Sequence, residues 1–267
     1  MLELTMRLRV LGSGSRGNSA LLSADETLIL LDAGLPIREL SARLESARIG
    51  HRGIDHVLVT HGHLDHSRSA GIIAKRHRAT LHCAERYFQN RALSRAPEKR
   101  PLPDGGLVEL EPRPGSDPGP VVRTARVPHD CDPTLALGIE HRGRHLSLVS
   151  DMGEPREDVA SALRDPHLLL LEANHDVEML RAGAYPQPLK DRVAGPRGHL
   201  SNDQMAVMLT RMVGPRTHTV VLIHLSEKNN TTDLALGAAK AALTRLDRPE
   251  IRVLTAAQHE PLDPIDV

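Results

Sequence analysis

Residues 60–66 read THGHLDH and follow directly on the apolar run HVLV (56–59). Three histidines and an aspartate, His61, His63, Asp65 and His66, stand at the end of this predicted buried strand. Imidazole and carboxylate are typical ligands of zinc, manganese or iron. We expect the rings of His61 and His63 to close on one ion, and Asp65 and His66 to point toward a second ion beside it. The pattern favours a metal site over a polar helix start with scattered histidines.

Outward from this motif, strand-like and helix-like segments follow one another along the chain. Short strands with tight connections are predicted at MRLRVLG (6–12), ALLS (20–23) and TLILLDAG (27–34), and helices at Pro36–Leu44 and Leu64–His77. Later strands are predicted at VVRTARV (121–127), TLALGIE (134–140), HLSLVSD (145–151), LLLLEAN (168–174), TVVLIHLS (219–226) and IRVL (251–254). Later helices are predicted at SNDQMAVMLTRM (201–212) and DLALGAAKAALTRL (233–246).

Two series of strands, each followed by helices and without an internal linker, predict a single layered α/β domain over residues 1–267. The Pro- and Gly-rich stretch between Arg95 and Pro120 is expected to be a surface excursion or a set of edge connections.

Composition limits the classes of partner and compartment. No run approaches the roughly 18 continuous apolar residues of a membrane helix, so no membrane partner is expected. The start, MLELTMRLRVLGSGS, has no apolar signal-peptide core, and Cys83 and Cys131 are the only cysteines, so a cytoplasmic location is expected. Lys+Arg and Asp+Glu both number 34. Net charge therefore predicts no bulk attraction for a polyanion.

THGHLDH matches the HxHxDH motif of the metallo-β-lactamase superfamily, and the resemblance extends along nearly the whole chain. It implies an αββα four-layer sandwich. It also implies three further ligands, each after an apolar run: His129 in RVPHD, Asp151 in LVSDMG and His224 in VLIHLS.

The same resemblance implies how the ligands divide between two divalent ions, for which zinc and manganese are both suitable. Asp151 would bridge the two ions. The first ion would be held by His61, His63 and His129, and the second by Asp65, His66 and His224.

Several segments that contribute no ligand narrow the resemblance to the WalJ/YycJ type of small metallo-β-lactamase-fold protein. They are LGSGSRGNSALL, LLDAGL, EANHD, GAYPQPLKDR, GHLSN and HLSEKNN, within Leu8 to Leu246. This narrower resemblance implies a metal-dependent phosphodiesterase, foremost a DNA 5′-to-3′ exonuclease in DNA repair. The implied partner is a nucleic acid, with DNA preferred; no protein partner is predicted.

LEANHD and GHLSN resemble two loops of the tRNA 3′-processing endonucleases. The resemblance implies that Glu172 orients His199, which protonates the departing oxygen, a step worth roughly 10²–10⁴-fold in rate. The nucleophile would be a hydroxide formed from a water between the ions and oriented by Asp65. A structural alternative makes Ser201 and Gln204 a capping box that fixes the loop, and Glu172 a strand-end carboxylate satisfied by backbone or arginine.

Substrate contacts are predicted from two other regions. Ser13, Ser15 and Asn18 in GSGSRGNS offer a phosphate cradle, with a plain hairpin turn as the alternative. Lys190 would guide the nucleic-acid backbone, unless its charge is simply solvated. His175 is expected on the same surface as the catalytic pair.

Three other functions remain open at this stage. An RNA-processing nuclease would use the same two loops, and a hydrolase of a small ester, thioester or lactone would use the same fold. The neutral charge and scarce aromatics favour the small-molecule hydrolase, whereas EANHD and GHLSN count against it. A scaffold that keeps metals for stability alone predicts that Asp65→Asn harms nothing.

Overall fold

The computed structural model describes residues 6–47, 53–113 and 118–267. Within it the chain divides into two compact units. Unit 1 comprises residues 1–124, 139–144 and 257–267, and unit 2 comprises residues 125–138 and 145–256. Two segments discussed in the sequence analysis lie partly outside the described residues: the N-terminal residues 1–15 and the Pro-rich stretch between Arg95 and Pro120. The single domain expected from the sequence stays a prediction.

Unit 1 contains a seven-stranded sheet of order β14-β1-β2-β3-β4-β5-β6. Strands β1 to β3 and β14 pair antiparallel, whereas β3 to β6 pair parallel. The carboxyl ends of β3 to β6 therefore meet at one edge. The bounds are β1 Met6–Gly12, β2 Ser19–Ala24, β3 Thr27–Leu31, β4 His56–Leu58, β5 Thr80–Cys83, β6 Glu98–Pro101 and β14 Ile265–Asp266.

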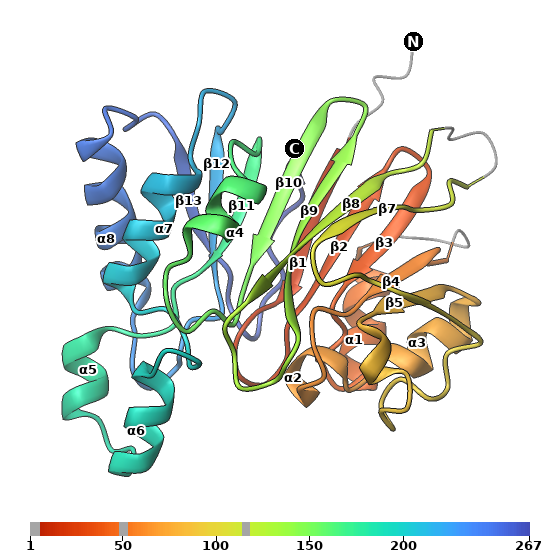
Figure 1. Ribbon diagram of the computed structural model, residues 1–267, viewed down its shortest axis with the longest axis horizontal. Helices are drawn as coiled ribbons and strands as arrows, with labels where there is room; N and C mark the ends of the chain where they lie inside the picture. Colours follow the sequence, from red (N-terminus) through yellow and green to blue (C-terminus); the bar gives the residue numbers. More distant parts are fainter. Residues whose placement is uncertain (1–5, 48–52, 114–117) are drawn as a thin grey trace. The chain divides into compact units, whose positions relative to one another are not determined.

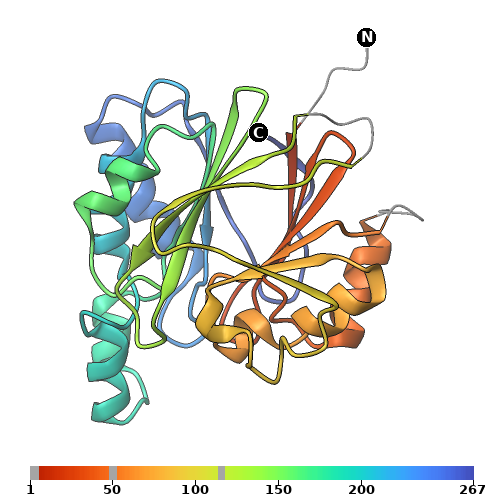
Figure 2. The same ribbon diagram turned by 45° about the vertical axis from the view of Figure 1, so that its right-hand side comes forward.

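Helices α1 (Ile37–Ser46), α2 (Leu64–Ser67) and α3 (Ala70–His77) accompany this sheet, with a 3₁₀ turn η2 (Glu85–Tyr87) after β5. Figures 1 and 2 show α1 and α3 along it, and α3 contacts β4 and β5. Leu40 of α1 and Ile73 of α3 are fully buried, so each helix turns an apolar face to the core.

The second sheet has the order β13-β12-β11-β10-β9-β8-β7. Strands β10 to β13 pair parallel, and β7 pairs antiparallel with β8. The bounds are β7 Gly106–Glu109, β8 Val121–Val127, β9 Thr134–His141, β10 Arg144–Val149, β11 Leu168–Glu172, β12 Thr219–Ile223 and β13 Arg252–Thr255. β6 and β7, from the Pro-rich stretch, are both edge strands, so the expectation of edge connections is confirmed for the described part of that stretch.

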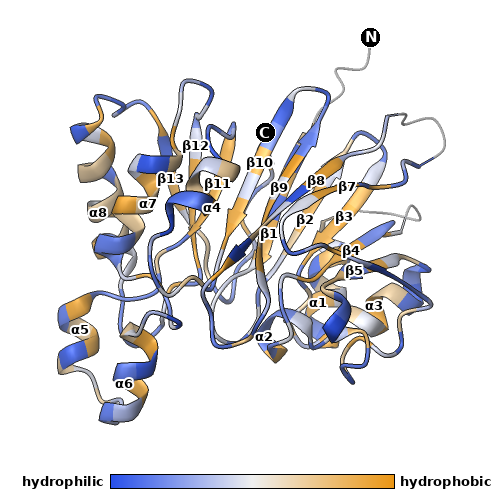
Figure 3. Cartoon of the chain, viewed as in Figure 1, coloured by the Kyte–Doolittle hydropathy of each residue, from blue (hydrophilic) through white to orange (hydrophobic). Residues whose placement is uncertain are grey.

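In unit 2, helices α4 (Glu157–Ala162), α7 (Asn202–Met212) and α8 (Thr232–Arg245) belong to the core of β10 to β13. Met205 and Leu209 of α7 join Leu171 of β11 and Leu222 of β12 in one buried cluster. Two short helices, α5 (Val177–Ala182) and α6 (Gln187–Ala194), lie together beyond the ends of these strands (Figure 1). The central strands of both sheets are largely hydrophobic, whereas α5 and α6 mix polar and apolar residues (Figure 3).

The continuous helix predicted over Leu64–His77 is wrong in one respect, because the structure has α2 and α3 with a break at Ser69. The Ser69 N–H donates to Ala33 O (2.8 Å) and its hydroxyl donates to Leu35 O (2.7 Å). These tertiary hydrogen bonds draw the backbone out of the helix. Among the described residues, no helix combines the length and the apolar character that crossing a bilayer requires.

Candidate metal centre

The histidine-rich motif lies at the carboxyl edge of the unit 1 sheet. Thr60 to His66 follow β4, and Asp32 follows the neighbouring parallel strand β3. The Asp32 N–H donates to Leu58 O (2.8 Å), so the two strand ends are held side by side. This is where ligands of an open α/β sheet are expected.

A buried carboxylate orients one of the predicted ligands. Asp32 Oδ2 lies 2.7 Å from His66 Nδ1, while Oδ1 accepts the Thr60 N–H at 2.8 Å. Because a carboxylate accepts hydrogen bonds, Nδ1 of His66 carries the proton and Nε2 keeps its lone pair. The Asn18 amide nitrogen lies 3.0 Å from this Nε2. His66 is thereby fixed in the tautomer that a metal ligand requires.

The four residues of the motif are gathered into one cluster in unit 1. The His61 ring centroid lies 4.9 Å from that of His63 and 4.3 Å from that of His66. Asp65 Oδ2 lies 3.6 Å from His66 Nε2. His61 and His66 are buried, whereas His63 and Asp65 are half-buried. All four side chains are of ligand type, and two of them retain some exposure.

Asn18 and Ser13 of the predicted phosphate cradle face the motif and their own loop. The Asn18 N–H donates to Asp65 O (2.7 Å), and its side-chain Oδ1 accepts the Gly14 N–H (2.9 Å) and the Ser13 hydroxyl (3.2 Å). Ser15 is exposed. The loop thus supports Asp65 and His66, and its contact with substrate stays a prediction.

In unit 2, the site residues again stand at the carboxyl ends of parallel strands. Asp151 comes two residues after β10, Glu172 ends β11, and His224 follows β12. Asp151 and His224 have φ values of 55° and 58°, in the left-handed region, as does Asp32 in unit 1 at 55°. Non-glycine residues held there carry strain, which gathers at functional sites.

Asp151 lies between two of the predicted ligands. Its Oδ1 is 3.8 Å from His129 Nε2 and 3.8 Å from His224 Nε2. The His129 Nδ1–H donates to Gly198 O (3.1 Å), which leaves Nε2 facing Asp151. Burial lowers the pKa of His129, so its ring is neutral and able to ligate. One carboxylate between two imidazoles suits the bridging role predicted for Asp151.

Glu172 is fully buried and carries four hydrogen bonds. Oε1 accepts from Nδ1 of His199 (2.8 Å) and of His224 (3.1 Å), and Oε2 accepts the backbone N–H groups of Met152 (3.0 Å) and Leu200 (3.3 Å). Burial alone would raise the pKa of Glu172, but the charge of His199 and these hydrogen bonds outweigh it and lower the pKa. Glu172 is therefore ionised at neutral pH, and both of its histidines direct Nε2 outward.

His199 stands in the loop before α7, which the predicted capping box fixes. The Ser201 hydroxyl accepts the Gln204 N–H (3.2 Å), and the Gln204 side chain accepts the Ser201 N–H (2.9 Å). The cap is confirmed, and it exists together with the Glu172–His199 contact, so the structural and catalytic interpretations are compatible. The His199 side chain retains 21% exposure, whereas Glu172 is fully buried.

The two remaining predicted contacts lie nearby in unit 2. His175 is buried, and burial lowers the pKa of its imidazole to about 4, so the ring is neutral. Lys190 lies on α6 and donates from Nζ to Arg181 O of α5 (2.6 Å), which joins the two helices. A substrate contact by either residue stays a prediction.

The sequence reasoning missed two residues that orient ligands. Asp32 holds His66, and the Asn174 amide lies 3.2 Å from His224 Nδ1 and donates to His224 O (3.0 Å). Both belong to quoted segments, LLDAGL and EANHD. Their signal was a polar residue shortly after an apolar strand, β3 for Asp32 and β11 for Asn174.

The donor sets of both units fit divalent metal ions. In unit 2, one ligand atom from each of Asp151, Glu172, His199 and His224 lies within 4.8 Å of the others. In unit 1, the clustered donors are three imidazoles and a carboxylate, the mixture that zinc, manganese and iron accept. The carboxylates and carbonyl that orient these histidines are the partners that metal-ligating imidazoles normally have.

Comparison with known proteins identifies a family, two relatives and a structure of the same fold. A profile of the beta-lactamase superfamily domain matches residues 27–225. The chain is 30% identical over 236 residues to the exodeoxyribonuclease WalJ of Streptococcus pneumoniae, covering 88% of this chain and 87% of the relative. It is 28% identical over 239 residues to the exodeoxyribonuclease YycJ of Bacillus anthracis, covering 86% of each. The metallo-beta-lactamase fold protein YhfI from Bacillus subtilis superposes with a TM-score of 0.72 at 15% identity, over 97% of this chain and 99% of that chain.

Proposed function

The chain belongs to the beta-lactamase superfamily, and on this premise we propose that it is a DNA exonuclease that digests from the 5′ end. The predicted fold, the predicted hydrolase class and the resemblance to the WalJ/YycJ type are confirmed by the comparisons. The DNA substrate, the polarity, a role in DNA repair and a cytoplasmic location are parts of the proposal. They are supported by the names of the two relatives and by the chemistry of unit 2.

The observation that carries the proposal is the contact of 2.8 Å between Glu172 Oε1 and His199 Nδ1. The leaving group of phosphodiester hydrolysis is an alkoxide, which departs poorly without a proton. Glu172 accepts the hydrogen bond from Nδ1–H of His199 and stabilises the imidazolium form of the ring. His199 can then deliver its second proton, on Nε2, to the leaving 3′-oxygen. A thioester hydrolase has less need of such a donor.

In the proposal, the ligands inferred from the sequence would hold two divalent ions, and Asp151 would contribute to both sites. When bound, the ions supply a nucleophile at neutral pH and neutralise charge on the phosphoryl oxygens. Asp65, half-buried and at the start of α2, would orient the attacking water through its carboxylate. Asp32 and Glu172 keep the histidines in the ligating tautomer.

Digestion of linear duplex DNA, labelled at either the 5′ or the 3′ end, tests the proposal. The wild type would shorten the strands from their 5′ ends when manganese or zinc is supplied, and excess chelator would abolish this. Asp65→Asn should abolish digestion, and His199→Ala should slow it by roughly 10²–10⁴-fold. His218→Ala is the matched control, because His218 precedes β12 at the strand end opposite to His224.

The other functions give different results in the same assay. If the protein cleaved an RNA of the same sequence faster than the DNA, RNA processing would become the favoured function in place of DNA digestion. A folded, metal-loaded protein that cuts neither nucleic acid would refute the nuclease proposal and direct the work to thioester and lactone substrates. His199→Ala with an unchanged rate on DNA would refute the assignment of the proton donor.

A further inference from the structure

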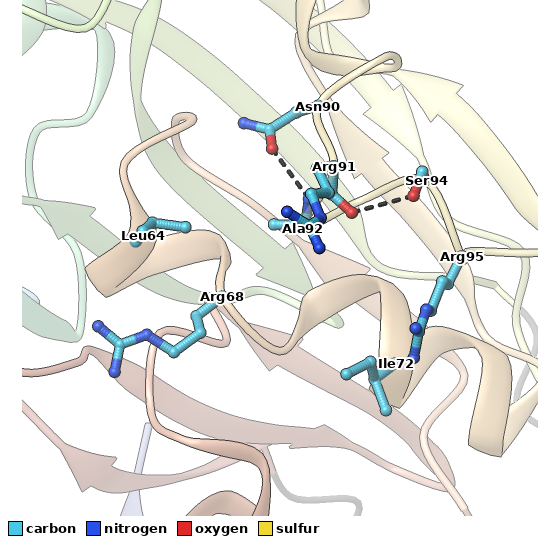
Figure 4. A pocket seen from close by; sticks show the side chains of 8 residues that line it. All are labelled: Leu64, Arg68, Ile72, Asn90, Arg91, Ala92, Ser94 and Arg95. Carbon is cyan, nitrogen blue, oxygen red and sulfur yellow. Dashed lines mark hydrogen bonds between the residues drawn. The ribbon is translucent and has the colours of Figure 1, made fainter.

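A pocket of about 450 Å³ lies in unit 1 beside the histidine-rich motif. Its wall is formed by α2, α3 and the turn after η2 (Figure 4). Its eight lining residues are Leu64, Arg68, Ile72, Asn90, Arg91, Ala92, Ser94 and Arg95. Three of them are arginines and none is acidic, so the lining carries a charge of +3 from its side chains.

The three arginines are exposed and are not engaged by the protein. Across the described ranges 6–47, 53–113 and 118–267, the guanidinium groups of Arg68, Arg91 and Arg95 make no hydrogen bond or ion pair. Some other arginines of unit 1 are paired, such as Arg113, which contacts Asp55 at 2.6 Å. Three cations around one concavity, with no acidic residue in its lining, give the pocket a positive potential that favours an anion.

The turn that carries Arg91 and Arg95 is fixed to the metal-binding region. Asn90 Nδ2 donates to Gly62 O (3.3 Å), between His61 and His63, while its Oδ1 accepts the Ala92 N–H (3.0 Å). The Gly71 N–H of α3 donates to Ala92 O (3.0 Å). The arginines therefore stand at a defined place next to the motif.

Leu64 connects the pocket directly to the motif. It lies between His63 and Asp65, its side chain is 60% exposed, and Arg68 is one helical turn further on the same face. Figure 4 shows Leu64 of α2 and Arg68, directly after α2, at one side of the pocket and Arg95 extending toward Ile72 at the other. A chain of anionic groups bound in the pocket would thus run past Leu64 toward the histidine-rich motif.

We propose that this pocket, defined by Arg68, Arg91 and Arg95, binds successive backbone phosphates of the nucleic-acid strand beside the metal centre. The inference rests on the proposed nuclease function and adds the path of the strand. Arginine forks bind phosphate oxygens bidentately, and exposed Leu64 offers apolar contact to a sugar or base. Contacts to phosphates carry no sequence information, so this pocket contributes affinity and position without base preference.

Binding of a short fluorescein-labelled single-stranded DNA, followed by fluorescence anisotropy over a range of salt concentrations, tests the inference. All variants are made in an Asp65→Asn background so that the probe stays intact. The test variant replaces Arg68, Arg91 and Arg95 with Gln. The matched control replaces three exposed unit 1 arginines outside the pocket, Arg38, Arg123 and Arg144, with Gln, so both proteins lose the same charge.

We expect the slope of log K against log salt to fall by about 2 for the pocket variant, because each lost phosphate contact removes about 0.7 from the slope for a single strand. The slope of the control should stay near that of the parent. The rise in Kd should be equal for two unrelated sequences. Circular dichroism confirms that all proteins are folded.

Equal slopes for the pocket variant and the control would overturn the inference, as would a parent protein that does not bind DNA. Binding is measured without hydrolysis, so the pocket and the nuclease activity are tested separately. A parent that binds through the pocket while the wild type cuts no DNA would support the pocket and refute the proposed activity. A wild type that digests DNA, with equal slopes for both variants, would support the activity and refute the pocket.

Discussion

At the scale of single residues, four histidines of the two units share one arrangement. Nδ1 of His66 is bonded to Asp32, Nδ1 of His129 to Gly198 O, and Nδ1 of both His199 and His224 to Glu172. Each ring therefore presents Nε2 outward. Metal ligation needs the neutral ring with a lone pair on Nε2, whereas delivery of a proton from Nε2 needs the imidazolium; the rings differ in exposure, since His224 is buried and His199 is half-buried.

Asp32→Asn should lower metal affinity roughly 10- to 100-fold, because an amide leaves His66 without its anionic partner. Asparagine tolerates the left-handed φ of 55° at this position, so the backbone should be preserved. Competition with a chromophoric chelator measures the affinity.

Asp25→Asn is the matched control for this substitution. Asp25 is also a turn aspartate of unit 1 with a left-handed φ, 51°, and it contacts His141 at 2.8 Å, away from the motif. An equal loss of affinity in both variants, or no loss in Asp32→Asn, would show that Asp32 does not orient a ligand.

At the scale of elements, the turn after β3 is held close to α2. A Cβ at Gly34 would lie 1.6 Å from Asp65 O, a distance that requires the backbone to move. Gly34→Ala should therefore destabilise the protein by at least about 1–3 kcal/mol, the usual cost of overpacking, and should weaken metal binding because Asp65 moves. Urea unfolding and the chelator competition measure the two effects.

Gly237→Ala gives the opposite expectation for the same chemical change. Gly237 lies inside α8 and has nothing near its missing Cβ, so alanine should stabilise the protein by about 0.4–1 kcal/mol. If Gly34→Ala behaved like Gly237→Ala, the close approach of the turn to α2 would be excluded as a constraint on the site.

Elements show where sequence reasoning succeeds and where it stops. The family resemblance implied His129, Asp151 and His224 as ligands, and the structure places Asp151 and His224 after neighbouring strands of the parallel part of the second sheet. The break at Ser69 was not foreseeable, since it depends on carbonyls of residues 33 and 35 that only the fold brings near. Helix α6 was missed because GAYPQPLKDR looks like a loop, although Pro188 stands in the first turn of the helix, where proline is tolerated.

At the scale of the whole molecule, buried neutral histidines make the free energy of unfolding depend on pH. His56 Nε2 donates to Glu111 O (2.8 Å), so its Nδ1 must accept from His82 Nε2 at 3.1 Å. His82 Nδ1 is then buried without a hydrogen-bond partner among the described residues. Burial, the neighbouring His56 and Arg100 together lower the pKa of His82 to about 3.

The unfolded chain binds a proton at His82 near its ordinary pKa of 6.5, whereas the folded protein does so only near 3. The unfolded state therefore holds more protons between these values, and stability is fully present above pH 6.5 and falls as the pH falls toward 3. From pH 7 to pH 5, protonation linked to His82 alone should lower the free energy of unfolding by about 2 kcal/mol.

The substitution His82→Gln keeps a donor to His56 but removes the titrating ring. The free energy of unfolding of this variant should therefore fall by about 2 kcal/mol less than that of the wild type between pH 7 and pH 5. Urea unfolding of both proteins at each pH, in excess chelator, gives the comparison, and the other histidines cancel in the difference. Parallel losses in the two proteins would mean that His82 is not held neutral by the fold.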